Sequence, residues 1–206
     1  DCAIEYTGGP VDMNRIRATF DLLPGLFWAD GAPLTALDSV YSFLLDSHPD
    51  TPSDKYLINR TAAYDQTGVL QTMWTGLPGY LTHTTGANFW TPLPEHLYSA
   101  FTPAELLTAD LSTRTPPGWG PYVIDEWVGG SHIAMHANPL YFRAGEGLPR
   151  FSGLVVRFVP DPLGEMLAGN CDVIPSSSDD LGALRSYDDQ GYLQLVSAPG
   201  AFEHLD

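Results

Sequence analysis

The stretch Phe27-Trp28-Ala29-Asp30-Gly31-Ala32-Pro33-Leu34-Thr35-Ala36-Leu37-Asp38 joins a predicted strand to a predicted helix. Before it, apolar and polar residues alternate over residues 15–22, which is typical of a half-buried strand. Thr35 and Asp38 have the spacing of a capping box, so we expect a helix over about 36–46. Its helical period predicts a buried face formed by Val40, Phe43 and Leu44.

The middle of the chain shows further local signals. Turn-forming residues at 64–68 precede a predicted strand over 69–74. A short helix is expected over 95–101, and Thr102 and Glu105 form a second capping box that starts another. Two further strands, over 122–127 and 131–137, are predicted to form a hairpin that turns at Gly129-Gly130.

In the last third, predicted strands alternate with predicted helices. The run over 154–159 is nearly continuously apolar, which is typical of a buried strand in a covered sheet. We expect a second buried strand over 171–174 and a final strand over 193–197. Short helices are predicted over 163–167 and from residue 178. This alternation indicates an α/β layer after a first part that is more typical of an α+β arrangement.

Charge and composition exclude several classes of protein. The 206 residues include 9 basic and 25 acidic side chains, and the formal net charge is −16. The electrostatic field of this negative net charge repels nucleic acids and anionic membranes. The hydrophobic share of 44% is too high for a disordered acidic chain. The sequence contains no apolar run of membrane-spanning length.

The sequence contains only weak candidates for catalytic or metal-binding residues. His132 and His136 are four residues apart, but on a strand this spacing is a poor basis for a metal site. Neighbouring carboxylates are more often helix caps and solvated faces than acid–base pairs; they occur at Asp125-Glu126, Asp179-Asp180 and Asp188-Asp189. No nucleophile elbow, phosphate-binding loop or dinucleotide fingerprint is found. We therefore expect no catalytic residues, no metal and no cofactor.

The two cysteines, Cys2 and Cys171, are either unreactive thiols or a long-range disulfide. Both lie beside predicted strands, and we predict that they pair. A disulfide would place the protein in an oxidising compartment.

Four segments stand out in order along the chain, at residues 18–43, 118–122, 138–142 and 156–173. Together they resemble the extracellular solute-binding proteins of family 5, the peptide/nickel type. The first contains the Asp-Gly-x-Pro-Leu-Thr-Ala pattern followed by a helix. The second and third are similar to the family's Gly-Thr-Gly-Pro-Tyr and Asn-Pro-x-Tyr-Trp patterns, and the fourth to its closing Ser-Gly-Glu-x-Asp-Ile pattern. The second segment reads Gly118-Trp119-Gly120-Pro121-Tyr122, and the third reads Asn138-Pro139-Leu140-Tyr141-Phe142. The first and fourth segments are residues 18–43 and 156–173.

The resemblance implies an α/β to α+β fold, the lobe I portion of a type II periplasmic-binding-protein-like fold with mixed sheets and flanking short helices. Residues 1–206 would then be a partial lobe I. Residues 1–115, approximately, would form an inserted α+β subdomain and 116–206 an α/β sheet portion. Members of the family are usually more than twice this length, so the second lobe would be absent.

The function implied by the resemblance is binding without chemical conversion. The protein would be the substrate-binding component of an ABC importer, would capture peptides or similar small solutes, and would deliver them to a membrane permease. It would be extracellular or periplasmic, and anchored as a lipoprotein in the full-length precursor. Peptides, nickel complexes, heme and sugars all remain open as the cargo.

For the ligand-facing surface, the resemblance favours the glycine loop and the last strand's end, with two further tryptophans as weaker candidates. Each of these residues has an alternative role in packing or in a structural turn. The candidates are Trp119, Gly120, Ala201, Phe202, Trp28 and Trp90.

Two rival functions stay open on the sequence. One is a secreted hydrolase that uses acidic residues together with His96 or His136. The other is a structural or interaction domain that binds no small ligand.

Overall fold

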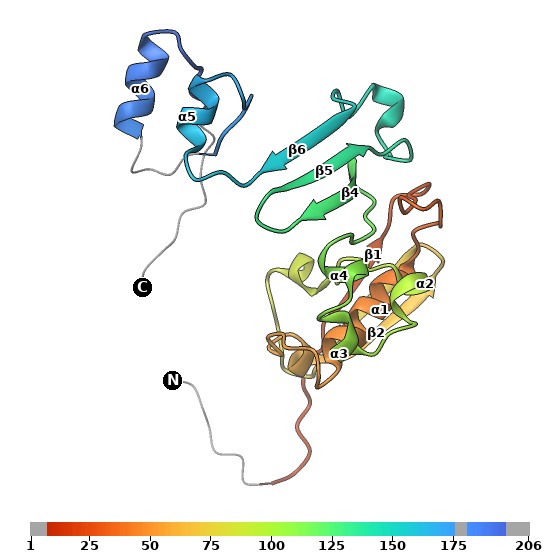
Figure 1. The fold of residues 1–206 in the computed structure, drawn as a ribbon. Coiled ribbons are helices and arrows are strands. Elements are labelled where there is room, and N and C mark those ends of the chain that lie inside the picture. The colour runs from red at the N-terminus through yellow and green to blue at the C-terminus, as the bar shows by residue number, and fades with distance from the viewer. Residues whose placement is uncertain (1–7, 176–180, 197–206) are drawn as a thin grey trace. The chain divides into compact units, whose positions relative to one another are not determined.

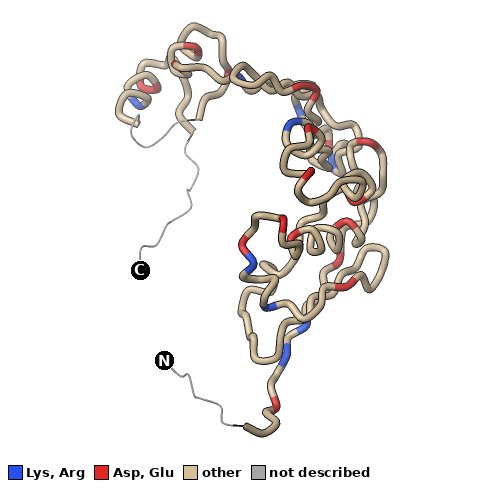
Figure 2. The backbone as a smooth tube through the Cα atoms, turned by 60° about the horizontal axis from the view of Figure 1, so that its bottom comes forward, with Lys and Arg blue, Asp and Glu red and all other residues tan. Residues whose placement is uncertain are grey.

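The computed structural model describes residues 8–175 and 181–196 (Figure 1). The chain divides into two compact units between Val156 and Arg157. Within the described residues, no helix has the length and apolar character needed to cross a membrane. Figure 2 shows that Asp and Glu residues are spread along the described part of the chain.

The first unit contains an antiparallel sheet with the strand order β1-β3-β2. Its strands are β1 (Arg17–Asp21), β2 (Thr61–Gly68) and β3 (Gln71–Gly76). The alternating burial of β1 confirms the predicted half-buried strand. Trp74, fully buried, lies at the centre of the sheet between Ala18 and Tyr64. Its indole Nε1 donates to Thr61 Oγ1 at 2.8 Å.

The predicted turn at 64–68 is wrong, because these residues belong to β2. The chain reverses at Val69-Leu70 instead. Tyr64 explains the difference: its ring is buried opposite Trp74, and its hydroxyl bonds to Thr72 Oγ1 at 3.0 Å. Burying this ring in the sheet outweighs the turn preference of the polar residues that follow it.

Helix α1 (Ala36–Ser47) begins with the predicted capping box of Thr35 and Asp38. The predicted buried face is wrong at Leu44, which is 59% exposed. The face that is buried carries short side chains instead; its members are Ala36, Asp38, Ser39 and Ser42.

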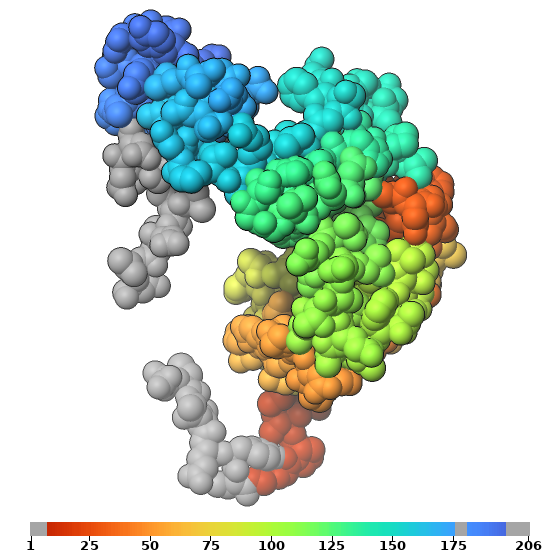
Figure 3. Space-filling view, in the orientation of Figure 1, coloured from red at the N-terminus to blue at the C-terminus, as the bar shows by residue number. Residues whose placement is uncertain are grey.

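The extended segment 90–94 lies along this polar face and leads into α2 (Glu95–Tyr98). Three side chains of α1 hold the main chain of this segment and the amide of Glu95. Ser42 Oγ donates to the carbonyl of Thr91 at 2.8 Å, and Asp38 Oδ1 accepts from the amide of Glu95 at 3.1 Å. Ser39 Oγ bonds to both the Trp90 carbonyl and the Tyr64 hydroxyl. The helix that begins at Glu95 contacts α1, and the chain in this region lies at the surface in yellow-green (Figure 3). Because the buried hydroxyls of Ser39 and Ser42 both have hydrogen-bond partners, this polar face is stable inside the unit.

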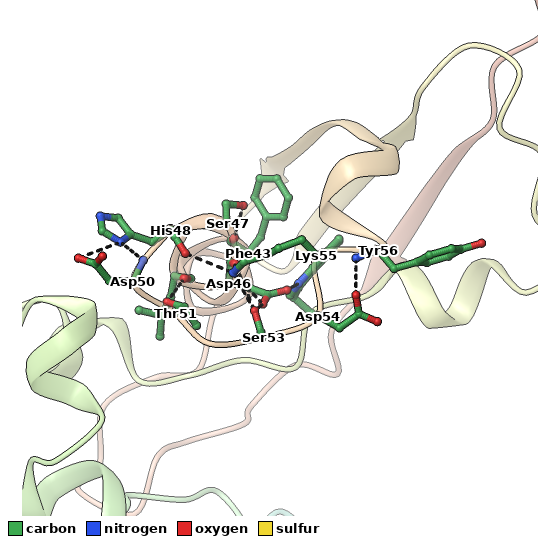
Figure 4. A network of polar contacts seen from close by, with 12 residues as sticks. Phe43, Asp46, Ser47, His48, Asp50, Thr51, Ser53, Asp54, Lys55 and Tyr56 are labelled. Carbon is green, nitrogen blue, oxygen red and sulfur yellow. Dashed lines mark hydrogen bonds and ion pairs between the residues drawn. The ribbon is translucent and has the colours of Figure 1, made fainter.

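The loop after α1 folds back and caps the helix (Figure 4). Lys55 Nζ donates to the carbonyls of Asp46 and His48 and lies 4.0 Å from the Asp46 carboxylate. Thr51 Oγ1 donates to the Leu45 carbonyl at 2.5 Å. A cation against the last carbonyls of a helix satisfies them and is favoured by the helix dipole.

Short helical elements complete this part of the first unit. Helix α3 (Pro103–Leu106) starts with the predicted capping box of Thr102 and Glu105, where Glu105 Oε2 accepts from the Thr102 amide at 2.8 Å. These hydrogen bonds from Thr102 hold the pKa of Glu105 below its usual range. The elements are η1 (Ile58–Arg60), η2 (Thr85–Asn88), α2 (Glu95–Tyr98), α3 (Pro103–Leu106) and α4 (Asp110–Thr113).

A second sheet follows in the order β4-β5-β6. Its strands are β4 (Tyr122–Val128), β5 (His132–Ala137) and β6 (Gly153–Arg157), with η3 (Ala144–Glu146) before β6. The predicted hairpin at Gly129-Gly130 is confirmed. The domain division expected near residue 115 falls in the loop between α4 and β4 and stays a prediction.

The expectation that the strand at 154–159 is buried is wrong. The strand forms, but Leu154, Val155 and Val156 are 42%, 58% and 40% exposed. Strand β6 lies at the edge of its sheet and pairs with β5 alone, so its side chains gain little cover from the described residues.

The second unit contains helices α5 (Pro162–Leu167) and α6 (Leu181–Asp189). The helix predicted over 163–167 is confirmed. The strands predicted at 171–174 and 193–197 are wrong where they are described: no strand forms over 171–174 or 193–196, and Val173 and Val196 are 84% and 78% exposed. An apolar run becomes a strand only with a neighbour to complete its hydrogen bonds, and these runs have none among the described residues.

Candidate functional site

The turn that joins β1 to α1 contains a small apolar core. We define the Trp28 turn as residues 26–34. Its buried side chains are Leu26, Trp28 and Leu34, which are 8%, 2% and 2% exposed. The amide of Trp28 donates to Ala32 O at 2.8 Å, and Gly31 takes a φ of +92° that side chains rarely adopt. The Asp-Gly pair therefore makes the sharp reversal that places Trp28 inside.

The glycine loop, residues 118–121, docks on the Trp28 turn. The amide of Ala29 donates to the carbonyl of Gly118 at 2.8 Å. Trp119 is half-buried and packs against the cluster of Leu26, Trp28 and Leu34. Thus the structure brings together two tryptophans that were proposed separately from the sequence.

Asn138 fixes the other side of the glycine loop. This residue is 1% exposed, and its Nδ2 donates to the carbonyl of Gly120 at 2.8 Å. Its own amide donates to the Pro121 carbonyl at 2.8 Å, and its Oδ1 accepts from the Leu140 amide at 2.9 Å. The sequence analysis did not single out Asn138, although it opens the Asn-Pro-x-Tyr segment. Three of the four segments that carry the family resemblance therefore meet around one loop.

Trp90 lies apart from this group. Its indole Nε1 donates to Asp46 Oδ2 at 2.9 Å, and its ring meets Phe43 and Tyr64 edge-on, each at 4.9 Å between centroids. These contacts hold Trp90 on α1 and β2. They are the contacts of a packing residue, and a ligand-binding role for Trp90 stays a prediction.

Asp30 and His96 link the Trp28 turn to α2. His96 Nε2 lies 2.7 Å from Asp30 Oδ2, and its ring lies 6.4 Å from that of Trp28. Partial burial by itself would raise the pKa of Asp30. The hydrogen bonds from His96 and Ala32, together with the charge of His96, outweigh burial and bring that pKa below its ordinary value.

The two histidines of β5 also face carboxylates. His132 Nε2 lies 3.2 Å from Glu126 Oε1, and His136 Nδ1 lies 2.6 Å from Asp125 Oδ1. In the part of the chain that the structure describes, no group of three or more His, Cys, Asp or Glu side chains is arranged to hold a metal ion. The two histidines thus form separate cross-strand pairs.

Three candidate residues, Ala201, Phe202 and Cys2, lie outside the described residues. Their proposed roles stay predictions. Cys171 is half-buried in the loop after α5.

We expect Cys2 and Cys171 to form a disulfide in the protein isolated from an oxidising compartment. Titration of the denatured, non-reduced chain with a thiol reagent should then find no thiol, and prior reduction should release two. Two thiols in the non-reduced sample would contradict the pairing. A Cys2→Ser variant is the control, because it should expose one thiol without reduction.

Comparison with known proteins gives the family and the fold. A family model described as "Bacterial extracellular solute-binding proteins, family 5 Middle" matches residues 11–204. The chain is 26% identical to a Deinococcus radiodurans protein described as "Probable ABC transporter-binding protein", across 89% of this chain and 34% of that one. It is 33% identical to protein XP55 of Streptomyces lividans, across 60% of this chain and 22% of that one. The chain thus spans about a third or less of the length of these relatives.

Solved structures share the fold at low identity. The oligopeptide-binding protein AppA from Bacillus subtilis, in complex with a nonapeptide, aligns with a TM-score of 0.71 and 21% identity over 84% of this chain and 34% of that one. Lactococcal OppA with an endogenous peptide aligns with a TM-score of 0.70 and 18% identity, over 87% and 38%. NikZ from Campylobacter jejuni, in complex with Ni(L-His), gives a TM-score of 0.67 at 19% identity, over 82% and 34%. These likenesses confirm the expected mixed α/β fold as part of such a binding protein.

Proposed function

Since the chain belongs to the bacterial extracellular solute-binding proteins of family 5, we propose that it forms part of the substrate-binding component of an ABC importer. In this role the whole protein captures peptides or similar small solutes and presents them, unaltered, to a membrane permease. It acts outside the cytoplasmic membrane, in the periplasm or at the cell surface, where a lipid anchor on the precursor holds it. The family match over residues 11–204 is the observation that carries this proposal.

Two further findings support the proposal. Relatives with the same fold were solved with a nonapeptide and with Ni(L-His), so this scaffold accommodates small solutes of different chemistry. Membership in a family of binding proteins also argues against the rival interpretation as a hydrolase.

We place the ligand against the glycine loop. Trp119 is half-buried, and a Cβ added at the neighbouring Gly120 would meet nothing within 4 Å. An indole held from behind by Leu26, Trp28 and Leu34 offers a rigid face on which a peptide or another solute can stack. Rigid aromatic anchors of this kind lose little conformational entropy on binding.

Replacing Trp119 with alanine in the full-length protein should therefore weaken ligand binding more than it weakens the fold. We expect the Kd for the best-bound peptide to rise by about tenfold or more, as is common for a tryptophan at the centre of an interface. Calorimetric titration with a random nonapeptide pool, and separately with a Ni–histidine complex, measures binding, and thermal unfolding measures stability.

The matched control is Trp127→Ala, since Trp127 on β4 is 37% exposed and lies outside the glycine loop. The Trp127→Ala variant should bind both probes with unchanged affinity. A large loss of stability in Trp119→Ala with unchanged affinity would make Trp119 a packing residue. No binding of either probe by the unmodified protein would favour the structural or interaction domain instead.

A further inference from the structure

The Asp30 carboxylate serves two partners at once. Its Oδ1 accepts from the amide of Ala32 at 3.0 Å, which closes the Asp-Gly turn. Its Oδ2 accepts from His96 Nε2 at 2.7 Å, which ties the same turn to α2. The two side chains are 38% and 33% exposed, so solvent competes for this bond but does not surround it.

Both ends of this link are fixed. On one side, the amide of Glu95, next to His96, donates to the buried carboxylate of Asp38, and this bond anchors the start of α2 on α1. On the other side, the amide of Ala29, next to Asp30, donates to the carbonyl of Gly118. A continuous series of bonds therefore runs from α1 through His96 and Asp30 to the glycine loop.

We propose that Asp30 and His96 are positioning residues that hold the Trp28 turn, and through it the glycine loop with Trp119, in place. Neither residue needs to touch the ligand for this role. The significance for ligand binding rests on the proposed function, in which Trp119 lines the site. The positioning itself is a property of the chain and can be measured without any ligand.

Asp30 and His96 should stabilise the turn more than an isolated surface ion pair would, because His96 also lies near a second residue of the turn. The imidazole ring also lies near the ring of Trp28, with 6.4 Å between the centroids and 49° between the ring planes. His96 is therefore close to the turn at two of its residues, Asp30 and Trp28. The lowered pKa of Asp30 is consistent with a carboxylate that stays charged and keeps both of its donors.

Amide hydrogen exchange by NMR on the 206-residue chain tests the positioning. The reporter is the amide of Ala29, which is protected by Gly118 O. In His96→Leu we expect its exchange to accelerate by about two- to fivefold, the range that follows from the strength of partly exposed charged pairs. His96→Gln retains a donor near Asp30 Oδ2 and should restore most of the protection. Amides of β3 paired with β1 should not change in either variant.

The matched control is His132→Leu, which removes another partly exposed histidine–carboxylate pair, with Glu126, on the β4–β5 hairpin. It should leave the Ala29 amide unchanged. The proposal is overturned if exchange at Ala29 is the same in His96→Leu as in the unmodified chain. It is also overturned if Leu and Gln at this position accelerate all amides alike, since that result marks a general loss of stability.

Calorimetry on the full-length protein with the nonapeptide pool separates this proposal from the proposed function. Lower affinity in His96→Leu, restored in His96→Gln, supports both. Faster exchange at Ala29 with unchanged affinity supports the positioning pair and contradicts the ligand site at Trp119.

Discussion

Replacing Trp28 with alanine is expected to lower the free energy of unfolding by about 3–5 kcal/mol, as for other large buried aromatic residues. Trp28 is 2% exposed and lies between Leu26 and Leu34, with Trp119 packed against the cluster. Its removal would leave a cavity at the point where β1, α1 and the glycine loop converge. Urea unfolding followed by far-ultraviolet circular dichroism measures the loss.

Trp28→Phe is the graded control for this prediction. Phenylalanine keeps most of the apolar volume and removes the indole Nε1, a buried donor that finds no hydrogen-bond partner among the described residues. Trp28→Phe should therefore lower the free energy of unfolding much less than Trp28→Ala does. A loss below about 1 kcal/mol for Trp28→Ala would contradict a packing role. Trp28 would then return as a candidate for ligand contact, as the resemblance had suggested.

Structural features that depend on contacts between residues three or four apart were predicted correctly from the sequence. Both capping boxes, Thr35 with Asp38 and Thr102 with Glu105, form as expected, because each bond joins residues three apart. The hairpin at Gly129-Gly130 also forms, since the two strands meet directly across the turn. In these cases the chain itself carries both partners of the interaction.

The predictions that failed depend on residues far away in the sequence. Helical periodicity favours burial of Leu44, but the hydroxyls of Ser39 and Ser42 reach carbonyls at residues 90 and 91. No local pattern indicates that an extended segment some 50 residues later will cover this polar face. The apolar runs at 154–159 and 171–174 show the converse, because their hydrophobicity predicts burial and the described residues supply little to bury them.

The candidate site was only partly predictable, because its motifs are local in sequence but the contacts between them are long-range. The family resemblance identified the Trp28 turn, the glycine loop and the Asn138 segment, but order along the chain does not show that they meet. Asn138 joins them through bonds that reach back some 17 to 18 residues to the glycine loop. His96 was considered only as a catalytic residue of a hydrolase. Its bond to Asp30, 66 residues away, became visible only in the fold.

The second large effect is expected for Asp38→Ala, with a loss of about 2–4 kcal/mol in the free energy of unfolding. Asp38 is 4% exposed, and its carboxylate performs two tasks. Its Oδ2 accepts from the amide of Thr35 at 2.8 Å and so caps α1, while its Oδ1 accepts from the amide of Glu95 at 3.1 Å and so anchors α2. Alanine would leave both amides without an acceptor in a site that water reaches poorly, which costs more than the loss of an exposed cap.

Glu105→Ala provides the matched control, because Glu105 has the same place in the capping box of α3 and is exposed to solvent. Water can replace its carboxylate at the Thr102 amide, so its loss should be clearly smaller. Urea unfolding of both variants measures the difference, and the amide of Glu95 gives a local readout by hydrogen exchange. Equal losses for the two variants would show that burial adds nothing to the role of Asp38. The bond to Glu95 would then not anchor α2, and the series of bonds from α1 to the glycine loop would lack its first member.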